Sequence, residues 1–350
     1  MPIGTVAAGQ VLVGGSDVAL LLNGAFRGTY DVREESYEPL RQMFMDDIPS
    51  MGLTETHAYW ETAPYPARWP RGFKRKSKGF KAVRYSIVNK DWEVAVGWHK
   101  NDRADDRLGG LEAQARTAGD HFATLPLRVA TQIKEASTND DLLDTIPNAP
   151  DGADLYNATD GASADRFGVS GGNTHSGTGV ANADMILEDF ETVMGRFLQF
   201  QNTEGQPLLN PAIIGEGVLI EYPPQIRRVM RQAFISAVQM ITINASGAHA
   251  ATSSVLTGAP IPSPLVAAGD KVTLFENPFL TDANDWYVHL TSNAIVKPLF
   301  RQTRQGVENH FATADNNNEM LVSGEESTWW DSREGYGVNQ PFGTQNVVVS

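Results

Sequence analysis

Apolar residues recur at every third or fourth position between Asp105 and Ser137, which is the period of one face of an α-helix. The members of this stripe are Leu108, Leu111, Ala115, Ala118, Phe122, Leu125, Val129 and Ile133. Such a helix is roughly 40–45 Å long at about 1.5 Å per residue. Pro126 should kink it, because proline lacks an N–H donor. The alternatives are an ordinary core helix or two helices that meet at Pro126.

Charged residues mark both ends of this predicted helix. Asp105 or Asp106 can cap its start, because free backbone N–H groups and the helix dipole favour a carboxylate there. Lys134 lies near its end, where the dipole favours a cation. Both positions support the helix boundaries.

A two-residue alternation before the helix predicts a hairpin of two half-buried strands. Its apolar positions are Val83, Tyr85, Ile87, Trp92, Val94, Val96 and Trp98. The segment Val88–Asp91 suits a tight turn between the two strands. Because a two-stranded hairpin cannot build a core alone, we expect it to lie on another surface.

The remaining chain mixes helices and strands without regular alternation, which favours an α+β fold. Helical patterns cover Arg33–Asp47, Asp184–Phe200 and the stretch opened by Pro223 and Pro224. Strand patterns cover Val218–Tyr222, Val272–Phe275, Trp286–Thr291, Val296–Gln302 and Asn346–Val349. Met1–Ser16 reads as an extended arm, Asp151–Gly179 as a loop and Asn244–Gly269 as a projecting loop.

The amino-acid composition limits the classes of protein to which the chain can belong. The chain has 350 residues, 41% of them hydrophobic, which is enough for a sizeable core in one large or two ordinary domains. It has no cysteine, so disulfides and thiolate metal sites are excluded. No apolar run reaches the roughly 18–20 residues of a membrane span, and we expect no signal peptide.

A dense basic run stands out in a chain whose net charge is −14. Its members are Arg68, Arg71, Lys74, Arg75, Lys76, Lys78, Lys81 and Arg84, with no acidic residue between them. The run could bind nucleic acid, or it could meet acidic surfaces of identical subunits. The second interpretation suits a chain whose remainder is strongly acidic.

Catalytic and metal-binding signals are poor. Gly172–Gly179 has phosphate-loop glycine spacing, but Thr178 stands where the lysine is needed, so we expect a flexible loop. An acidic group lacks the twelve-residue calcium pattern and reads as a solvated loop; it comprises Asp140, Asp141, Asp144, Asp151 and Asp154. The seven histidines lack metal-binding spacing. We therefore predict no catalytic residue, cofactor or metal.

An arm, a basic aromatic hairpin and a projecting loop expose surface that is costly unless a partner covers it. A homomeric assembly with heterologous contacts covers all three at once. The sequence therefore favours a protein built for its own copies.

Several short segments support this interpretation. They are Phe26, Tyr30, Tyr59-Trp60, Pro66–Trp69, Tyr85–Glu93, Asp105-Asp106, Gly205–Leu208, Pro223-Pro224, Asp285–Tyr287, Lys297–Leu299, Asp331–Arg333 and Gly335–Gly337. In order and spacing they resemble the major head (capsid) subunit of Mu-like tailed phages. The segment near Gly171, the loop Asn244–Gly269 and the last residues match that family poorly.

This resemblance implies the Hong Kong 97-type capsid fold, which is α+β. Its parts would be an N-terminal arm (1–54), an extended-loop hairpin (55–104), a peripheral domain with the spine helix (105–150), an axial domain (151–284) and a return to the peripheral domain (285–350). Inter-subunit contacts of the extended loop would be Arg68, Arg71, Lys74, Arg75, Lys76, Lys78, Lys81, Arg84, Trp92 and Trp98.

The resemblance also implies a function. The chain would be a structural major capsid protein that self-assembles into hexamers and pentamers of an icosahedral head around double-stranded DNA. Scaffold, portal and decoration proteins would be further partners, and assembly would take place in the host bacterial cytoplasm. Contact with DNA would be weak and nonspecific, because tight phosphate binding would hinder packaging. The alternatives are a tail or baseplate protein, or a monomeric carbohydrate-active or calcium-binding enzyme with paired carboxylates.

Overall fold

The computed structural model describes residues 15–60, 68, 71, 74, 82–101, 108–136, 142–156, 166–202, 205–235, 271–293, 295–313 and 317–349. Several predicted features lie outside these residues. They are the extended segment before residue 15, the helix cap at Asp105 or Asp106, the projecting loop Asn244–Gly269, and Arg75, Lys76, Lys78 and Lys81 of the basic run.

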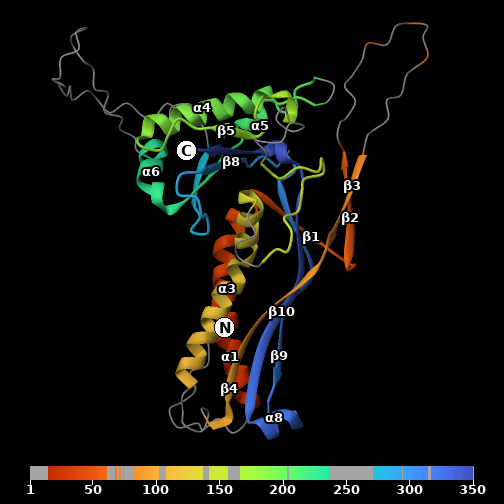
Figure 1. Cartoon of the computed structure of the whole chain (residues 1–350), viewed down its shortest axis with the longest axis vertical. Helices are drawn as coiled ribbons and strands as arrows, with labels where there is room; N and C mark the ends of the chain where they lie inside the picture. The colour runs from red at the N-terminus through yellow and green to blue at the C-terminus, as the bar shows by residue number, and fades with distance from the viewer. Residues whose placement is uncertain are drawn as a thin grey trace, which may run out of the picture.

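The lower part of the molecule is a long sheet with two long helices on one face (Figure 1). The strand order is β1–β9–β10–β4, with β1 parallel to β9 and the other pairs antiparallel. These strands are β1 (Met45–Pro49), β4 (Lys90–His99), β9 (Leu299–Ala312) and β10 (Glu325–Val338). The helices are α1 (Gly15–Arg41) and α3 (Leu108–Glu135), and the short α8 (Asn318–Ser323) lies between β9 and β10 in the chain.

The long helix expected from the apolar stripe is α3. From Leu111 to Ile133 every residue of the predicted stripe is buried, so the helical period is confirmed. The helix runs as one element through Pro126. The alternative of two separate helices is therefore wrong, because packing on both sides outweighs the hydrogen bond that proline removes.

The predicted short helix Arg33–Asp47 is wrong in extent. Helix α1 begins at Gly15 and ends at Arg41, and the residues after it form strand β1. Val18, Leu22 and Phe26 are fully buried against α3 and the sheet. These residues are four positions apart, so they form the buried helical stripe of the first half of α1.

The two long helices approach each other closely at Gly119. A Cβ atom placed there would lie 2.6 Å from the backbone oxygen of Phe26, so the position admits no side chain. We expect Gly119→Leu to force the helices apart and to cost about 1–3 kcal/mol of the free energy of unfolding. Urea unfolding of the soluble subunit, followed by circular dichroism, measures this loss.

A matched control lies on the same helix. At Gly110 an added Cβ meets no atom within 4 Å. Gly110→Leu should be neutral or stabilising by up to about 1 kcal/mol, because leucine is the better helix former. Equal losses at the two positions would contradict the close-approach argument.

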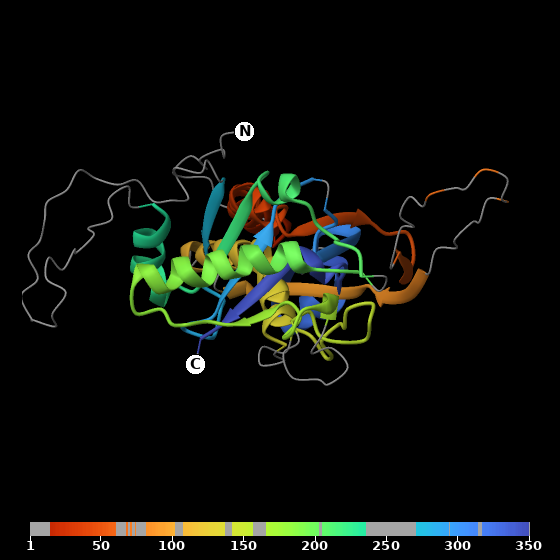
Figure 2. The same cartoon turned by 90° about the horizontal axis from the view of Figure 1, so that it is seen from above.

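The upper part of the molecule is a five-stranded sheet in the order β5–β11–β8–β6–β7. Its strands are β5 (Thr174–Ser176), β6 (Val218–Tyr222), β7 (Val272–Glu276), β8 (Trp286–Leu290) and β11 (Thr344–Val348). The helices beside it are α4 (Ala183–Gln199), α5 (Pro211–Ile214) and α6 (Arg227–Phe234). Figure 2 shows α4 lying across this sheet.

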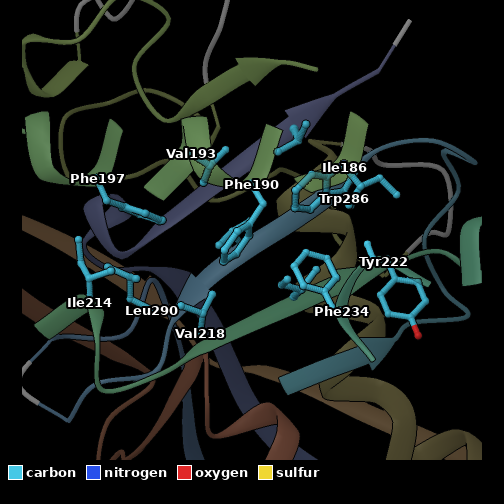
Figure 3. Packing of buried hydrophobic residues seen from close by; sticks show 14 of the residues in the cluster. Ile186, Phe190, Val193, Phe197, Ile214, Val218, Tyr222, Phe234, Trp286 and Leu290 are labelled. Carbon is cyan, nitrogen blue, oxygen red and sulfur yellow. The ribbon is translucent and has the colours of Figure 1, made fainter. Parts of the chain in front are cut away.

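Helix α4 confirms the predicted helix Asp184–Phe200 to within one residue at each end. Its buried stripe meets Trp286 and Leu290 of the sheet and Phe234 of α6 (Figure 3). Strand β6 has the predicted bounds, and all five of its residues are buried. The buried residues of α4, α6 and the upper sheet form one core, which is separate from the core between the two long helices and the lower sheet.

Sheet membership corrects the predicted return segment 285–350. Strands β9 and β10 do join the lower sheet. Strands β8 and β11 instead pair within the upper sheet, where β8 lies between β11 and β6. Residues 285–350 therefore pass from the upper sheet to the lower sheet and back again. This is possible because neighbouring strands in a sheet need not be neighbours in sequence. None of the described helices is long and apolar enough to cross a membrane.

Candidate assembly interface

A two-stranded ribbon projects from the body of the molecule (Figure 1). It consists of β2 (Thr54–Trp60) and β3 (Ala82–Val88), paired antiparallel. The predicted hairpin between β3 and β4 is therefore wrong: both strands form, but β3 pairs with β2 and β4 pairs with β10. A two-residue period identifies strands without identifying their partners.

Asn89 anchors the root of this ribbon and does not occupy an exposed turn. It is 3% exposed, and its Nδ2 donates to the Ser50 hydroxyl at 2.7 Å and to the Gly52 carbonyl at 2.8 Å. Gln302 of β9 donates to Asn89 Oδ1 at 2.8 Å. Since every polar group of the Asn89 amide is satisfied, the network fixes the point where β3 gives way to β4.

Glu55 fixes the turn on the other side of the root. Its carboxylate accepts the backbone N–H groups of Met51 at 2.7 Å and Gly52 at 2.8 Å, and the Ser50 hydroxyl at 3.0 Å. Hydrogen bonds from Gly52, Met51 and Ser50 hold the pKa of Glu55 below its usual range. The ionised carboxylate thus holds the turn before β2.

Ring contacts and a close approach join the ribbon to the sheet. His57 of β2 contacts Phe300 with ring centroids 4.7 Å apart, and Tyr85 of β3 does so at 6.2 Å. A Cβ atom at Gly337 of β10 would lie 1.9 Å from Cδ1 of Ile87. The ribbon is therefore packed on β9 and β10 at its root while its far end is directed away from them (Figure 1).

The described basic residues of the predicted site are all exposed. Arg84 lies on β3, and Arg68, Arg71 and Lys74 lie between the two ribbon strands in sequence. The ion pairs of the described residues include none of these four side chains. Exposed positive charge thus lies on β3 and in the chain segment between the two ribbon strands.

The two tryptophans of the predicted site are not on the ribbon, so their placement there is wrong. Trp98 is 5% exposed on β4, and its Nε1 donates to Glu326 at 2.8 Å. Trp92 meets Tyr336 edge to face, with ring centroids 6.0 Å apart. Both rings cover the core of their own subunit, because alternate residues of β4 face the helices.

A buried polar network, which the sequence did not reveal, joins α3 to the upper sheet. The Lys134 ammonium donates to both carboxylate oxygens of Glu221 on β6, and both side chains are fully buried. Lys134 also lies over the Phe44 ring, 4.6 Å from its centroid. Lys134, which was expected to interact with the helix dipole, therefore forms a buried ion pair that joins the two parts of the molecule.

The network continues through His289 of β8. Its Nε2 lies 3.0 Å from Glu221, and its Nδ1 lies 2.8 Å from the Thr344 hydroxyl, which lies 2.6 Å from the Tyr156 hydroxyl. Burial lowers the pKa of His289, which favours the neutral ring. A neutral ring donates from Nε2 to the carboxylate and accepts at Nδ1, so each group has a partner.

Opposing effects set the pKa of Glu221. Burial would raise it, but Lys134 and the hydrogen bond from His289 outweigh burial and lower it to about 2. Asn277 adds a further hydrogen bond to the same carboxylate and donates to the Thr131 hydroxyl at 2.9 Å. Glu221 is thus ionised near neutral pH, with its charge compensated inside the protein.

The remaining candidate sites have structural roles. Asp144 pairs with Lys90 at 2.6 Å, and Asp151 pairs with Arg166 at 2.6 Å. The glycine segment Gly172–Gly179, expected to be a flexible loop, contains strand β5. Arg196 of α4 donates to three carbonyl oxygens of residues 170–174, which holds the glycine-rich turn in place.

Residues 19–145 match the family model described as Mu-like prophage major head subunit gpT. This span covers most of α1, the ribbon, β4 and α3. No match was found among curated proteins. The resemblance inferred from short sequence segments is confirmed over this part of the chain.

Three solved structures are similar over most of the chain. The mature capsid of bacteriophage PhiM1 matches with a TM-score of 0.51 and 11% identity over 88% of this chain and 85% of that one. The capsid of cyanophage P-SCSP1u matches with a TM-score of 0.50 and 11% identity over 89% and 88%. Mycobacterium phage Bobi matches with a TM-score of 0.50 and 13% identity over 88% and 90%. These similarities confirm the expected α+β fold of the Hong Kong 97 type.

Proposed function

We propose that this chain, a phage major capsid protein of the Mu-like head-subunit type, closes into hexamers and pentamers of an icosahedral head around double-stranded DNA. The family match and the shared fold support the capsid function. The alternatives of a tail or baseplate protein, or of a monomeric enzyme, are not favoured by these matches. The chain is thus a component of the virion capsid.

One observation carries the assembly proposal. The ribbon is anchored at its root, while exposed Arg84 on β3 and Arg68, Arg71 and Lys74 between its strands have no ion-pair partner among the described residues. A two-stranded ribbon is marginally stable by itself in water. Contact with a neighbouring subunit would cover it, and repetition of that contact would close a ring. This supports head-to-tail packing of copies.

The proposed capsid subunit would also have partners other than its own copies. Scaffold, portal and decoration proteins would act on the assembled shell, and assembly would take place in the host cytoplasm. The role is structural rather than catalytic. The net charge of −14 favours weak, nonspecific contact with the packaged DNA, since phosphate contacts need positive charge.

Charge reversal on the ribbon tests the proposal. We expect the triple variant Arg71→Glu, Lys74→Glu and Arg84→Glu to fold normally but to lose assembled particles by about tenfold or more, because reversed charges repel an acidic partner surface. Negative-stain microscopy and sedimentation measure assembly, and circular dichroism measures folding.

The control keeps the charge at the same positions: Arg71→Lys, Lys74→Arg and Arg84→Lys. It should assemble normally if charge, rather than side-chain shape, is what the partner recognises. Normal shells from the charge-reversed protein would show that the ribbon charges are irrelevant to assembly. A wild-type protein that stays monomeric under all assembly conditions would contradict the proposed function itself.

A further inference from the structure

The two parts of the molecule are joined by buried polar side chains from several elements. Helix α3 reaches the upper sheet at its C-terminal end (Figure 1), and there its Lys134 forms an ion pair with Glu221 of β6. His289 of β8 lies 3.0 Å from Glu221 and 2.8 Å from Thr344 of β11. The Thr344 hydroxyl lies 2.6 Å from that of Tyr156. We call Lys134, Tyr156, Glu221, His289 and Thr344 the junction cluster.

The junction cluster has no net charge when the His289 ring is neutral. The Lys134 ammonium and the Glu221 carboxylate compensate each other, and both side chains are fully buried. Within the described part of the chain, Glu221 is the acidic residue that pairs with His289. Because this carboxylate already compensates Lys134, a proton added to His289 would create a buried positive charge without a counter-charge of its own.

The hydrogen bonds of the junction cluster also suit a neutral ring. The ring donates from Nε2 to Glu221 and accepts at Nδ1 from the Thr344 hydroxyl, which in turn accepts from Tyr156. Burial raises the pKa of Tyr156 well above its ordinary value, so its hydroxyl keeps its proton and can donate. A second ring proton at Nδ1 would point at the Thr344 proton, and both hydroxyls would need to turn to accommodate it.

Among the described residues, the other groups around His289 oppose a charged ring or carry no charge. Lys134 of α3 repels a protonated ring, while Glu221 attracts it. Phe44, which lies between α1 and β1 in the chain, stacks on the ring with centroids 5.2 Å apart. Burial and Lys134 together outweigh Glu221 and lower the pKa of His289. The closed junction therefore holds the neutral ring, whereas water solvates either form.

We propose that the junction cluster is an acid-sensitive lock, in which protonation of His289 loosens the contact between α3 and the upper sheet. The core under α4 and the core between α1 and α3 are separate, so neither needs to unfold when the junction loosens. Ile133, Leu219 and Phe275 belong to one apolar cluster at this junction, which keeps the two parts together. The inference goes beyond the proposed function, because it concerns the response of a single subunit to acid.

The direction of the pH dependence follows from proton binding. In a loosened junction that admits water, the pKa of His289 returns to its ordinary value of 6.5, above that of the closed state. Loosening therefore takes up a proton, and the stabilisation that is complete above about pH 6.5 is lost as the pH falls. Glu221, whose pKa is lowered from 4.5 to about 2, adds to this effect only below about pH 4.5. Between these values the loosening constant should rise by up to about tenfold per pH unit.

Thiol labelling of the full-length, unassembled subunit tests the inference. The chain has no cysteine, so Thr131→Cys places a single thiol at the junction, where Thr131 is 2% exposed and accepts from Asn277 at 2.9 Å. Its labelling by a dithiodipyridine, relative to free cysteine at the same pH, should be at least about tenfold faster at pH 5 than at pH 7. Ala115→Cys, at a fully buried position between α1 and α3, should show no such rise.

Histidine variants identify the proton acceptor. In the Thr131→Cys background, His289→Gln keeps a donor and an acceptor but cannot take up the proton, so labelling should be equally slow at pH 7 and pH 5. His175→Gln, which changes the histidine beside Asp189 in the upper part, should retain the acid response. If His289→Gln fails to fold, the contrast between Thr131→Cys and Ala115→Cys decides.

Three results would overturn the lock. The first is labelling of Thr131→Cys that does not change between pH 7 and pH 5. The second is an equal rise for Thr131→Cys and Ala115→Cys, which would indicate general unfolding in acid. The third is an undiminished acid response in folded His289→Gln, which would place the titrating group elsewhere.

Discussion

Lys134→Met should destabilise the folded subunit by about 3–5 kcal/mol, because it leaves the buried Glu221 carboxylate without its compensating charge. Water cannot take the place of the ammonium, since both side chains are completely buried. The loss should appear as a lower urea midpoint of the soluble subunit, measured by circular dichroism. Assembly should fail along with folding, because the ion pair joins α3 to the upper sheet.

Two comparisons separate this effect from simple loss of a side chain. The double variant Lys134→Met with Glu221→Gln should recover about 1 kcal/mol or more, since no uncompensated charge remains. Arg116→Met, on the same helix but in an exposed pair with Glu112, should cost less than about 1 kcal/mol. A double variant as unstable as Lys134→Met alone would show that packing, not charge, dominates at this position.

Trp330→Ala should cost about 3–5 kcal/mol, the range for truncating a large aromatic residue in a core. Trp330 is fully buried and stacks on Phe26 of α1 with ring centroids 4.2 Å apart. Its Nε1 donates to Asn23 of the same helix at 3.0 Å, so truncation also leaves that amide without a partner. Urea unfolding followed by circular dichroism measures the change without relying on tryptophan fluorescence.

The adjacent residue supplies the matched control. Trp329 lies next to Trp330 on β10 but faces the opposite side of the sheet, where it is half-buried. Trp329→Ala should change the stability of the isolated subunit by about 1 kcal/mol or less. Equal stability losses for the two tryptophans would contradict the assignment of the two faces.

Local patterns were sufficient to predict most elements. The three- and four-residue spacing predicted α3 and α4, because burial of one helical face imposes that period on the sequence. Strand β6 was predicted at its observed bounds for a similar reason, since a short apolar run suits a strand buried on both faces. The full length of α1 was missed because polar residues after Phe26 interrupt its stripe.

Pairing could not be predicted in the same way. The alternation around Asn89 was interpreted as a hairpin, yet β3 and β4 each pair with a strand from elsewhere in the chain. The basic run was recognised from its charge, but Trp92 and Trp98 of β4 were wrongly assigned to the same projecting element. Trp92 and Trp98 share their strand with exposed residues, and the sequence alone does not say which face of β4 the helices cover.

The sequence by itself determined the helical and extended segments, the basic run and the resemblance to capsid subunits, because each depends on residues close together in the chain. The tertiary structure alone decided which strands are neighbours, which tryptophans are internal, and that Lys134 meets Glu221 across 87 positions. It also aligned Glu93, Asp331 and Glu308 across three strands. Backbone hydrogen bonds between strands and compensation of buried charge depend on proximity in space, which no local period records.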